Sequence, residues 1–481
     1  MYVITVCNGF DFRQISPGQS LEFYRWLFRK AKSEYGMISY ELDFVNQNLN
    51  CIDEFTTNTE SAKSVFDGMA AAAQELGLVM QWCYANPSAA LQSLNYPSMT
   101  NMRASFDYVS IENRKSFSHD DRNIPVTCTL LKIYNLFIFL QYYGDSWDTG
   151  TSSLFLWALD IAPSTDTFWT SDNGNVATTM GGCDKTKGCP QDHSDAGCEL
   201  HTILAIMSTG PVGFSDAISQ TNVARIMKTC RADGILLQPN KPLTPFDGHL
   251  DQRWRVLQTY SGPPTSPSNH DNHSGEKNVT NVWAYYIVAH RLTNLPNRHV
   301  SVQLRDLWPR PRSASKWFIV WDHDNEACTT EGASAEQCGE LMDADDGSLN
   351  FHEESDDYQA ARASIFATVP CSPRSLGTKG KGVRSSDDDD SWVLLGEVAE
   401  KYVSVSNRRF RHITCEDNNL RFNMEVVLGE TVKVSAINSG KVWTQTYSFS
   451  GKSINQRKVE GPQIVSLSMG ANDMHRTTTI F

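Results

Sequence analysis

The sequence predicts an α/β protein: a (β/α)8 barrel of the TIM type, incomplete at its N-terminus, followed by a C-terminal antiparallel β-sandwich. Three observations favour this fold class. Over residues 1–250, stretches with helical spacing alternate with short apolar runs, as in parallel strands joined by helical crossovers. Aspartates recur directly after these apolar runs, where α/β proteins collect their functional groups. Beyond residue 280, short β-rich runs replace the helical spacing.

The expected elements of the first half follow from the spacing of apolar side chains and from glycine stops. The expected helices are 20–36, 61–77, 150–161, 198–208 and 219–230. The expected strands are 37–42, 78–84, 96–108, 162–169 and 209–216. No glycine-rich phosphate loop follows the first strand, so a closed barrel is favoured over an open doubly wound sheet.

Three regions of different composition give the expected domain organisation. Residues 1–250 form the barrel, with its strands from about the third to the eighth. Residues 251–280 are rich in Pro, Ser, Asn and Gly and are expected to be a linker or long loop. Residues 281–481 form the β-sandwich, which contains an acidic loop at 375–390.

Composition and charge exclude several classes of function. The net charge of −13 disfavours a nucleic-acid partner. The longest apolar run, 130–143, is interrupted by Lys132 and Asn135 and is shorter than the ~18 residues that a membrane span needs. The acidic run 387–390 lacks the spacing of an EF-hand loop, so we expect no metal site there. The sequence also gives no reason to expect a cofactor.

Cysteines and sequons indicate the compartment. The twelve cysteines form no close CxxC pair, and those that cluster locally are expected to form local disulfides. The clustered cysteines are Cys183, Cys189 and Cys198 in one loop and Cys328 and Cys338 in another. Sequons begin at Asn272 and Asn278. These features predict a secretory glycoprotein, extracellular or lysosomal, although the chain opens without a signal peptide.

Two carboxylates lie close together at the end of the strand 37–42. Side chains alternate along a strand, so Glu41 and Asp43 point to the same face. Like charges this close are costly unless a site uses or neutralises them. Further aspartates, Asp107, Asp166 and Asp216, follow later expected strands. Together they predict a polar site at the carboxyl ends of the strands.

Four motifs in order resemble a known enzyme group: YELDF, RASFDY, DTFW and STGPVGFSDAISQTN…RADGILLQPNKPLTPFD. Over about residues 20–250 the chain resembles the catalytic half of the α-galactosidases and raffinose synthases, glycoside hydrolase family 36 and its relatives. That resemblance implies a retaining mechanism on a (β/α)8 barrel with a C-terminal β-domain. It also implies that α-linked sugars, above all α-galactosides, are the substrates.

The resemblance assigns a role to each aspartate. Asp43 matches the family's nucleophile, and Asp107, in the stretch from Arg103 to Asp107, matches its acid/base. Asp166 matches a sugar-binding aspartate, and Asp216 belongs to a Ser-Asp pair after the last strand. A retaining glycosidase needs such a pair of carboxyl groups about 5–5.5 Å apart. The alternative for any of these aspartates is a helix N-cap or a loop contact.

Other side chains are expected to contact the sugar. Glu41 stands where relatives often carry Lys, which inverts the charge beside the nucleophile. Arg103 is expected to hold a carboxylate ionised or to bind a hydroxyl. The indoles of Trp82, Trp147 and Trp169 are candidates for stacking on the sugar; for Trp82 and Trp169 the alternative is a place in the barrel core.

Three functions compete. The first is a retaining glycoside hydrolase for α-linked sugars, with transfer to another sugar as an option. The second is a non-catalytic, carbohydrate-binding or degenerate barrel. The third, a metal-dependent hydrolase using His270, His273 or the stretch WDHDN, lacks any HExxH-type spacing. The sequence does not predict an oligomeric state.

The strand count predicts a truncated chain. A barrel of this type takes about 250 residues and eight strands, yet only some 36 residues precede the strand with Asp43. They leave room for one earlier strand, residues 2–9. We therefore expect an N-terminal part, with any signal peptide, to be missing. The stretch 109–143 is longer than expected and is interpreted as an extra helix or as retained non-coding sequence.

Overall fold

The computed structural model divides the chain into two compact units, Met1–Thr167 with Gly210–Gly213, and Phe168–Thr209 with Phe214–Phe481. We describe each unit by itself. The structure describes residues 2–7, 10–43, 45, 52–83, 85, 87–104, 145–168, 170–171, 196–216, 218–246, 254–262, 284–291, 299–309, 317–322, 325–343, 346–352, 362–367, 392–416, 419–449, 463–469 and 478–479.

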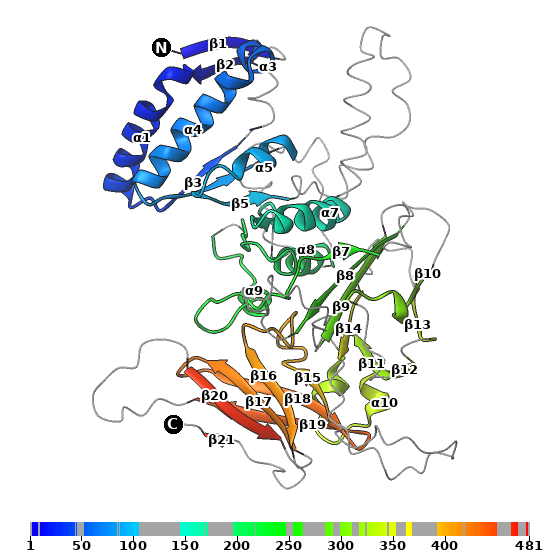
Figure 1. Cartoon of the computed structure of the whole chain (residues 1–481). Coiled ribbons are helices and arrows are strands. Elements are labelled where there is room, and N and C mark those ends of the chain that lie inside the picture. The colour runs from blue at the N-terminus through cyan, green and yellow to red at the C-terminus, as the bar shows by residue number, and fades with distance from the viewer. Residues whose placement is uncertain are drawn as a thin grey trace, which may run out of the picture. The chain divides into compact units, whose positions relative to one another are not determined.

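The first unit is built on a parallel sheet. Its strands are β3 (Ser39–Leu42), β4 (Val79–Trp82), β5 (Met99–Arg103) and β6 (Ala162–Ser164), which pair in chain order (Figure 1). This confirms the predicted parallel α/β arrangement. A closed barrel is not seen: within the described residues β3 and β6 are the open edges of a four-stranded sheet.

Helices cover one face of this sheet. The long ones are α1 (Ser20–Tyr35), α4 (Thr59–Glu75) and α7 (Asp145–Ala158), and the short ones are α3 (Asp53–Thr57) and α5 (Pro87–Ser93). Helix α1 ends at Gly36, which takes the left-handed φ of 68° that favours glycine. The predicted stop is thereby confirmed.

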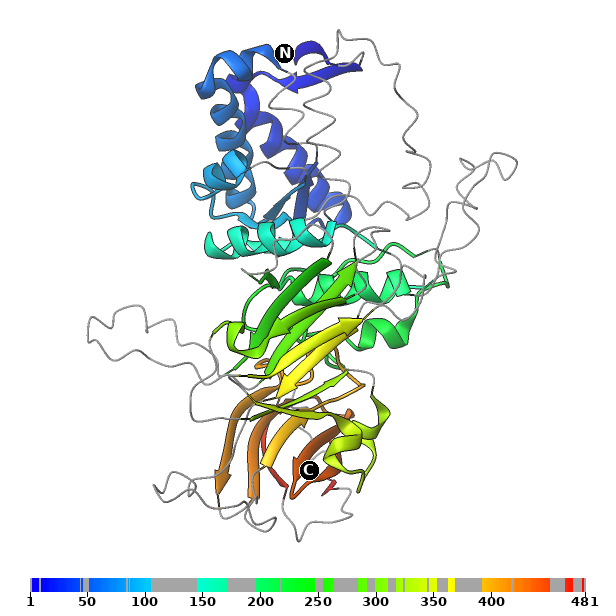
Figure 2. The ribbon, with the colours of Figure 1, turned by 90° about the vertical axis from the view of Figure 1, so that its right-hand side faces the viewer.

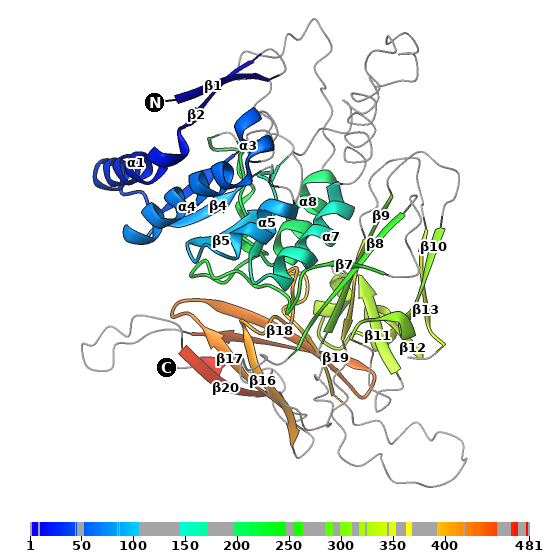
Figure 3. The ribbon, with the colours of Figure 1, turned by 45° about the horizontal axis from the view of Figure 1, so that its top comes forward.

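Helices α1 and α4 run side by side (Figure 3). They bury Phe28 and Met69 completely in a common core. The backbones approach most closely at Gly68 of α4, where a Cβ atom would lie 2.5 Å from the amide nitrogen of Leu21. Only a residue without a side chain fits this crossing without moving one of the helices.

The stretch expected to supply an early barrel strand forms a hairpin instead. Strand β1 (Tyr2–Cys7) pairs antiparallel with β2 (Phe10–Ile15) in a separate two-stranded sheet. A tight hairpin satisfies the backbone groups of both strands locally, so β1 does not add to the parallel sheet.

The expected last barrel strand, 209–216, forms no regular strand. Within the first unit Gly210 lies against the backbone of Pro163, where a Cβ atom would come within 1.5 Å of its carbonyl oxygen. Within the second unit Phe214 makes an isolated parallel bridge with Phe168. Pro211 has no N–H to donate, which weakens any continuous ladder here.

The second unit begins with helices and continues as antiparallel sheets. Helices α8 (Ala196–Met207) and α9 (Val223–Met227) lie within two of the predicted helical stretches. A six-stranded sheet follows, in the order β12-β11-β14-β9-β8-β7. Its green to yellow strands are seen near the middle of Figure 2. Its strands are β7 (Thr244–Pro245), β8 (Trp254–Ser261), β9 (Ala284–Arg291), β11 (Trp317–Asp322), β12 (Glu340–Asp343) and β14 (Arg362–Ala367).

Strand β8 corrects the prediction of a linker at 251–280. Residues 254–261 pair along their whole length with β9, and Val256 and Leu257 are fully buried. The rest of the predicted linker, from residue 263, lies outside the described residues, as does the acidic loop 375–390. A further small antiparallel pair joins β10 (His299–Gln303) to β13 (Ser348–His352).

Two more sheets complete the second unit. One contains β15 (Trp392–Gly396), β18 (Thr431–Asn438), β19 (Lys441–Ser448) and the short β21 (Thr478–Thr479). The other contains β16 (Phe410–Glu416), β17 (Asn419–Val426) and β20 (Gln463–Met469). Phe422 of one sheet meets Tyr447 of the other edge-to-face, with ring centroids 6.2 Å apart. The predicted antiparallel character of the C-terminal half is confirmed.

A buried charge cluster lies beside these sheets. The guanidinium of Arg409, with 1% of its side chain exposed, pairs with Glu397 at 3.0 Å and with Glu430 at 2.6 Å. Arg231, also 1% exposed, pairs with Asp233 and Glu425. Burying these guanidinium groups is tolerated because carboxylates surround them.

One predicted disulfide is present, between Cys328 and Cys338. Cys198 lies buried in α8, whereas Cys183 and Cys189 lie outside the described residues, as do both sequons. No helix in the described part of the chain is both long and apolar enough to cross a membrane. The stretches 109–143 and 270–273 are also outside the described residues.

Candidate functional site

One face of the parallel sheet carries polar side chains in two rows. The strand register aligns Glu41 with Gln81, and Gln81 with Asn101, across three neighbouring strands. Residues two positions further along each strand point to the same face. The first row contains Glu41, Gln81 and Asn101, and Ser164 of β6 hydrogen-bonds to its Asn101 end. The second contains Asp43, Cys83 and Arg103 and continues to Asp166, two residues beyond Ser164, which is the register partner of Arg103. The second row lies at the carboxyl ends of the strands.

The opposite face of the sheet is apolar. Trp82 and Met102 are aligned in neighbouring strands and are buried under the helices. The indole of Trp82 is fully buried and packs against Phe66 and Tyr96, with ring centroids 4.9 and 6.0 Å away. Trp82 is therefore a core residue, and its prediction as a sugar-stacking platform is wrong.

Contacts connect the second row from strand to strand. Nη1 of Arg103 donates to Sγ of Cys83 at 2.9 Å, and it lies 3.6 Å from Oδ2 of Asp166. Cys83 in turn is hydrogen-bonded to Asp43. The row thus joins the predicted nucleophile, the predicted sugar-binding arginine and the predicted sugar-binding aspartate.

The thiol of Cys83 is held protonated. Burial raises its pKa well above its ordinary range, and the hydrogen bond to the Asp43 carboxylate adds to this effect. The positive charge of Arg103 acts in the opposite direction but is smaller. A protonated thiol donates to Asp43 and accepts from Arg103, so it fits both of its neighbours.

Hydrogen bonds in the first row all run in one direction. The hydroxyl of Ser164 donates to Oδ1 of Asn101 at 3.1 Å, and Nδ2 of Asn101 donates to Oε1 of Gln81 at 2.9 Å. Nε2 of Gln81 then donates to Oε1 of Glu41 at 3.3 Å. The row therefore ends on a carboxylate, which is exposed at the edge of the sheet.

The spacing of the strands decides which carboxylates can act as a catalytic pair. Asp43 and Asp166 follow the two outer strands of the sheet, and both Cys83 and Arg103 lie between their carboxylates. A retaining pair needs about 5–5.5 Å. Asp166 is thus placed to orient Arg103 and a ligand, not to share a bond-breaking step with Asp43. Its Oδ1 also accepts the N–H of Thr167 at 2.8 Å.

Asp216 lies in the second unit and braces its own loop. Its Oδ1 accepts the N–H of Thr170 at 2.8 Å, and its Oδ2 accepts the hydroxyl of Thr170 at 2.7 Å. The same hydroxyl accepts the N–H of Asn222 at 2.7 Å. The two carboxylate oxygens therefore hold Thr170 in place, one through its backbone N–H and the other through its hydroxyl, which is the loop role that was the alternative for this aspartate.

The remaining predicted site residues are not described. Asp107 and Trp169 lie outside the described residues, and of Trp147 only the backbone is described, within α7. Sequence reasoning missed Gln81, Cys83, Asn101 and Ser164. The alternation of side chains between the two faces of a strand, here called strand parity, would have found the first two. Gln81 and Cys83 alternate with the apolar Met80 and Trp82, just as Glu41 and Asp43 flank Leu42.

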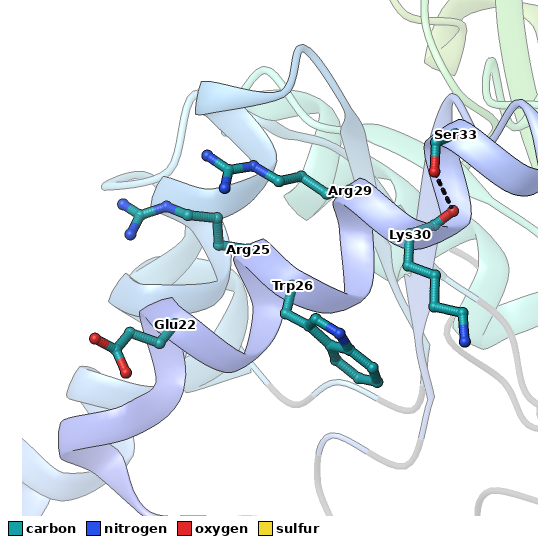
Figure 4. Close-up of a pocket in the computed structure, with 6 residues that line it drawn as sticks. All are labelled: Glu22, Arg25, Trp26, Arg29, Lys30 and Ser33. Carbon is teal, nitrogen blue, oxygen red and sulfur yellow. Dashed lines mark hydrogen bonds between the residues drawn. The ribbon is translucent and has the colours of Figure 1, made fainter.

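A shallow groove outside this sheet lies on the exposed side of α1 (Figure 4). It is lined by Glu22, Arg25, Trp26, Arg29, Lys30 and Ser33. Arg25 is paired with Glu75 of α4 at 2.6 Å, and the Lys30 ammonium lies 5.8 Å from the Trp26 ring. The groove is open and carries no pair of catalytic groups. Across the described ranges, no group of three or more His, Cys, Asp or Glu side chains could hold a metal ion.

Neither the models of known protein families nor the curated proteins contain a match to this chain.

The polar face can bind a ligand that is rich in hydroxyl groups. Carboxylates and amides accept hydrogen bonds, while amide and guanidinium N–H groups donate them, and sugars present both kinds of partner. These side chains project from the strands or from the one or two residues that follow them, and they are tied to a neighbour, so the face is preorganised.

Proposed function

We propose that the chain is a retaining glycoside hydrolase that acts on α-linked sugars, with α-galactosides first, on a sheet that belongs to a (β/α)8 barrel with a β-sandwich behind it. One observation carries the proposal: Asp43, Arg103 and Asp166 lie on one face at the carboxyl ends of parallel strands and are connected through Cys83. The order of the sequence motifs that resemble family 36 supports the same assignment.

The residues divide the reaction between them. Asp43 attacks the anomeric carbon, so that the bond to the leaving oxygen breaks while a bond to a carboxylate oxygen forms. Asp107, four residues beyond Arg103, donates a proton to the leaving oxygen and later takes one from the attacking water. If a second sugar takes the place of that water, the same steps give transfer. Cys83 orients the nucleophile, and Arg103 with Asp166 binds sugar hydroxyls.

A covalent label tests nucleophile and substrate together. Activated 2-deoxy-2-fluoro-α-glycosides should inactivate the protein and leave the mass of one sugar on the peptide that contains Asp43. Asp53→Ala, which removes an exposed aspartate at the start of α3, is the matched control and should label like the wild type. A label on another carboxylate would refute the role of Asp43.

Kinetics separate the two catalytic roles. Asp43→Ala should abolish turnover of all aryl glycosides. Asp107→Ala should retain activity on dinitrophenyl glycosides, whose leaving group needs no proton, and lose it on unactivated sugars. If Asp43→Ala turned over a dinitrophenyl glycoside as fast as the wild type, the mechanism would be wrong.

A non-catalytic, sugar-binding function is the second candidate. The observation in its favour is the negative charge of Glu41 on the same strand face as the nucleophile, where relatives often carry a positive charge. Sugar binding measured by calorimetry without any turnover or labelling would support this candidate over the first.

A further inference from the structure

A disulfide-closed loop lies against the outer edge of strand β19. The buried cysteines Cys328 and Cys338 close its two ends, with their Cα atoms 4.5 Å apart. The chain between them contains only the end of a 3₁₀ helix, Glu326–Thr329, and the start of a short α-helix, α10 (Ala335–Cys338). Helices of about one turn are not stable alone. The residues between the cysteines therefore depend on the disulfide and on their contacts for their shape.

Residues 329–335, here called the covering loop, hydrogen-bond to the backbone at the centre of this edge. The N–H of Val442 donates to the carbonyl oxygen of Ala333 at 2.8 Å. The carbonyl oxygen of Val442 accepts the N–H of Gly332 at 2.9 Å. The covering loop thus takes the place that a neighbouring strand would take beside Val442.

The positions two residues before and after Val442 are covered as well. The carbonyl oxygen of Gly440 accepts the N–H of Ala335 at 2.8 Å. The N–H of Thr444 donates to the carboxylate of Glu331. Further along, β21 pairs with the end of β19, so the covering loop and β21 follow each other along this edge.

The covered edge is complementary to a second copy of itself. It turns two acceptors outward, the carbonyl oxygens of Gly440 and Val442, and two donors, the N–H groups of Val442 and Thr444. In an antiparallel pair with a two-fold axis at Val442, the two Val442 residues exchange both of their hydrogen bonds. Each Thr444 then donates to Gly440 of the other copy. All four groups find partners of the kind that the covering loop supplies.

We propose that the covering loop, held by the Cys328–Cys338 disulfide, closes a strand-pairing surface, and that a chain without this disulfide pairs with a second copy along β19. An uncovered strand edge is a template for pairing with another chain. The proposal is independent of the glycosidase function.

The choice between the two states falls during folding, because both cysteines are buried in the folded chain. The S–S bond forms when the two thiols pass two electrons and two protons to a disulfide reagent, which becomes two thiols. Folding in an oxidising compartment therefore closes the edge, and folding under reducing conditions leaves it open.

Hydrogen exchange tests whether the cover depends on the disulfide. In the full chain with Cys328→Ala and Cys338→Ala, the amides of Val442 and Thr444 should exchange faster by about a hundredfold, the effect expected for a cross-link that closes a loop of about this length. Cys230→Ala is the matched control. It removes a buried cysteine of the same unit that lies outside the disulfide, and it should leave these amides unchanged.

Light scattering after size exclusion tests the docking surface. The double alanine variant should show, with rising concentration, a species of twice the wild-type mass, and Cys230→Ala should not. Adding Thr444→Pro to the double variant removes an outward N–H on which the pairing depends, and an edge strand tolerates a proline there. The triple variant should return to the wild-type mass.

Each failure contradicts a different step. Unchanged exchange at Val442 and Thr444 would show that the disulfide does not hold the cover. Faster exchange with an unchanged mass would show that the open edge binds no second copy. Larger species that persist after Thr444→Pro would come from misfolding rather than from pairing along β19, and would also refute the proposal.

Discussion

Removal of the Arg409 guanidinium should destabilise the C-terminal sheets strongly. Arg409→Met keeps much of the buried volume but leaves the carboxylates of Glu397 and Glu430, with 3% and 6% of their side chains exposed, without their cation. Breaking a buried ion pair by removing one partner costs about 3–5 kcal/mol. Arg409 also donates to the carbonyl oxygen of Glu425 at 2.8 Å, which places the expected cost in the upper half of that range.

Hydrogen exchange measures this loss where it occurs. Peptides from β16 and β17 should exchange faster in Arg409→Met by roughly two to four orders of magnitude, because 1.4 kcal/mol corresponds to a factor of ten. The matched control is Arg25→Met. Arg25 pairs with Glu75 at the same 2.6 Å distance, but the two side chains are 31% and 42% exposed. Solvent screens a pair this exposed, so its loss should have little effect on stability. Equal effects of the two variants would refute the reasoning from burial.

The loss of stability in Arg409→Met should depend on pH in a defined direction. Burial raises the pKa of Glu397 above its ordinary value, against the lowering effects of Arg409 and Lys401. Without Arg409 this pKa rises further. A carboxyl whose folded-state pKa is raised binds its proton more tightly in the folded state, so its favourable contribution is present at low pH and is lost as pH rises. The deficit of Arg409→Met should therefore be smaller at pH 5 than at pH 8.

Two further predictions concern the first unit. The pKa of Cys83 is raised above its ordinary 9.0, so at pH 8 less than about a tenth of the thiol is thiolate. Iodoacetamide should therefore label Cys83 at least tenfold more slowly in the folded chain than in the urea-unfolded chain. Equal labelling rates, measured by peptide mapping, would contradict this. Gly68→Ala should lower the free energy of unfolding in urea by about 1–3 kcal/mol, because the added Cβ meets the backbone of α1. Ser64→Ala, on the exposed side of α4, is the control and should have no such effect. An equal effect of the two variants would refute the close approach of α1 and α4 at Gly68.

Local patterns predicted the elements but not all of their partners. The spacing of apolar residues located α1, α4 and α8, and a glycine marked the end of α1, since these signals act within one or two turns of chain. Residues 2–7 also form the strand that their sequence indicates. Its partner is β2 rather than β3, because backbone pairing is decided between segments and a hairpin neighbour is entropically the nearest.

Composition was a poor guide where an apolar strand borders a polar stretch. Strand β8 was included in the expected linker because the following residues are rich in Pro, Ser and Asn. Yet Trp254–Ser261 pairs with β9 along its whole length. Its consecutive residues Val256 and Leu257, which point to opposite faces of the sheet, are both fully buried. When composition is averaged over both segments, the apolar signal of the strand disappears, whereas an average over the length of one strand still shows it.

Strand parity carries more information about the candidate site than any single motif does. In β4 the run Met80, Gln81, Trp82, Cys83 alternates apolar with polar side chains, and a sheet covered by helices on one face must bury the apolar set. Parity alone therefore places Trp82 under the helices and Cys83 beside Asp43. The aspartate that parity cannot assign is Asp216, which follows an irregular segment, and its two oxygens hold Thr170 instead. A carboxylate at the end of a strand is thus a candidate for chemistry only where the alternation of apolar and polar side chains along that strand extends to the carboxylate itself.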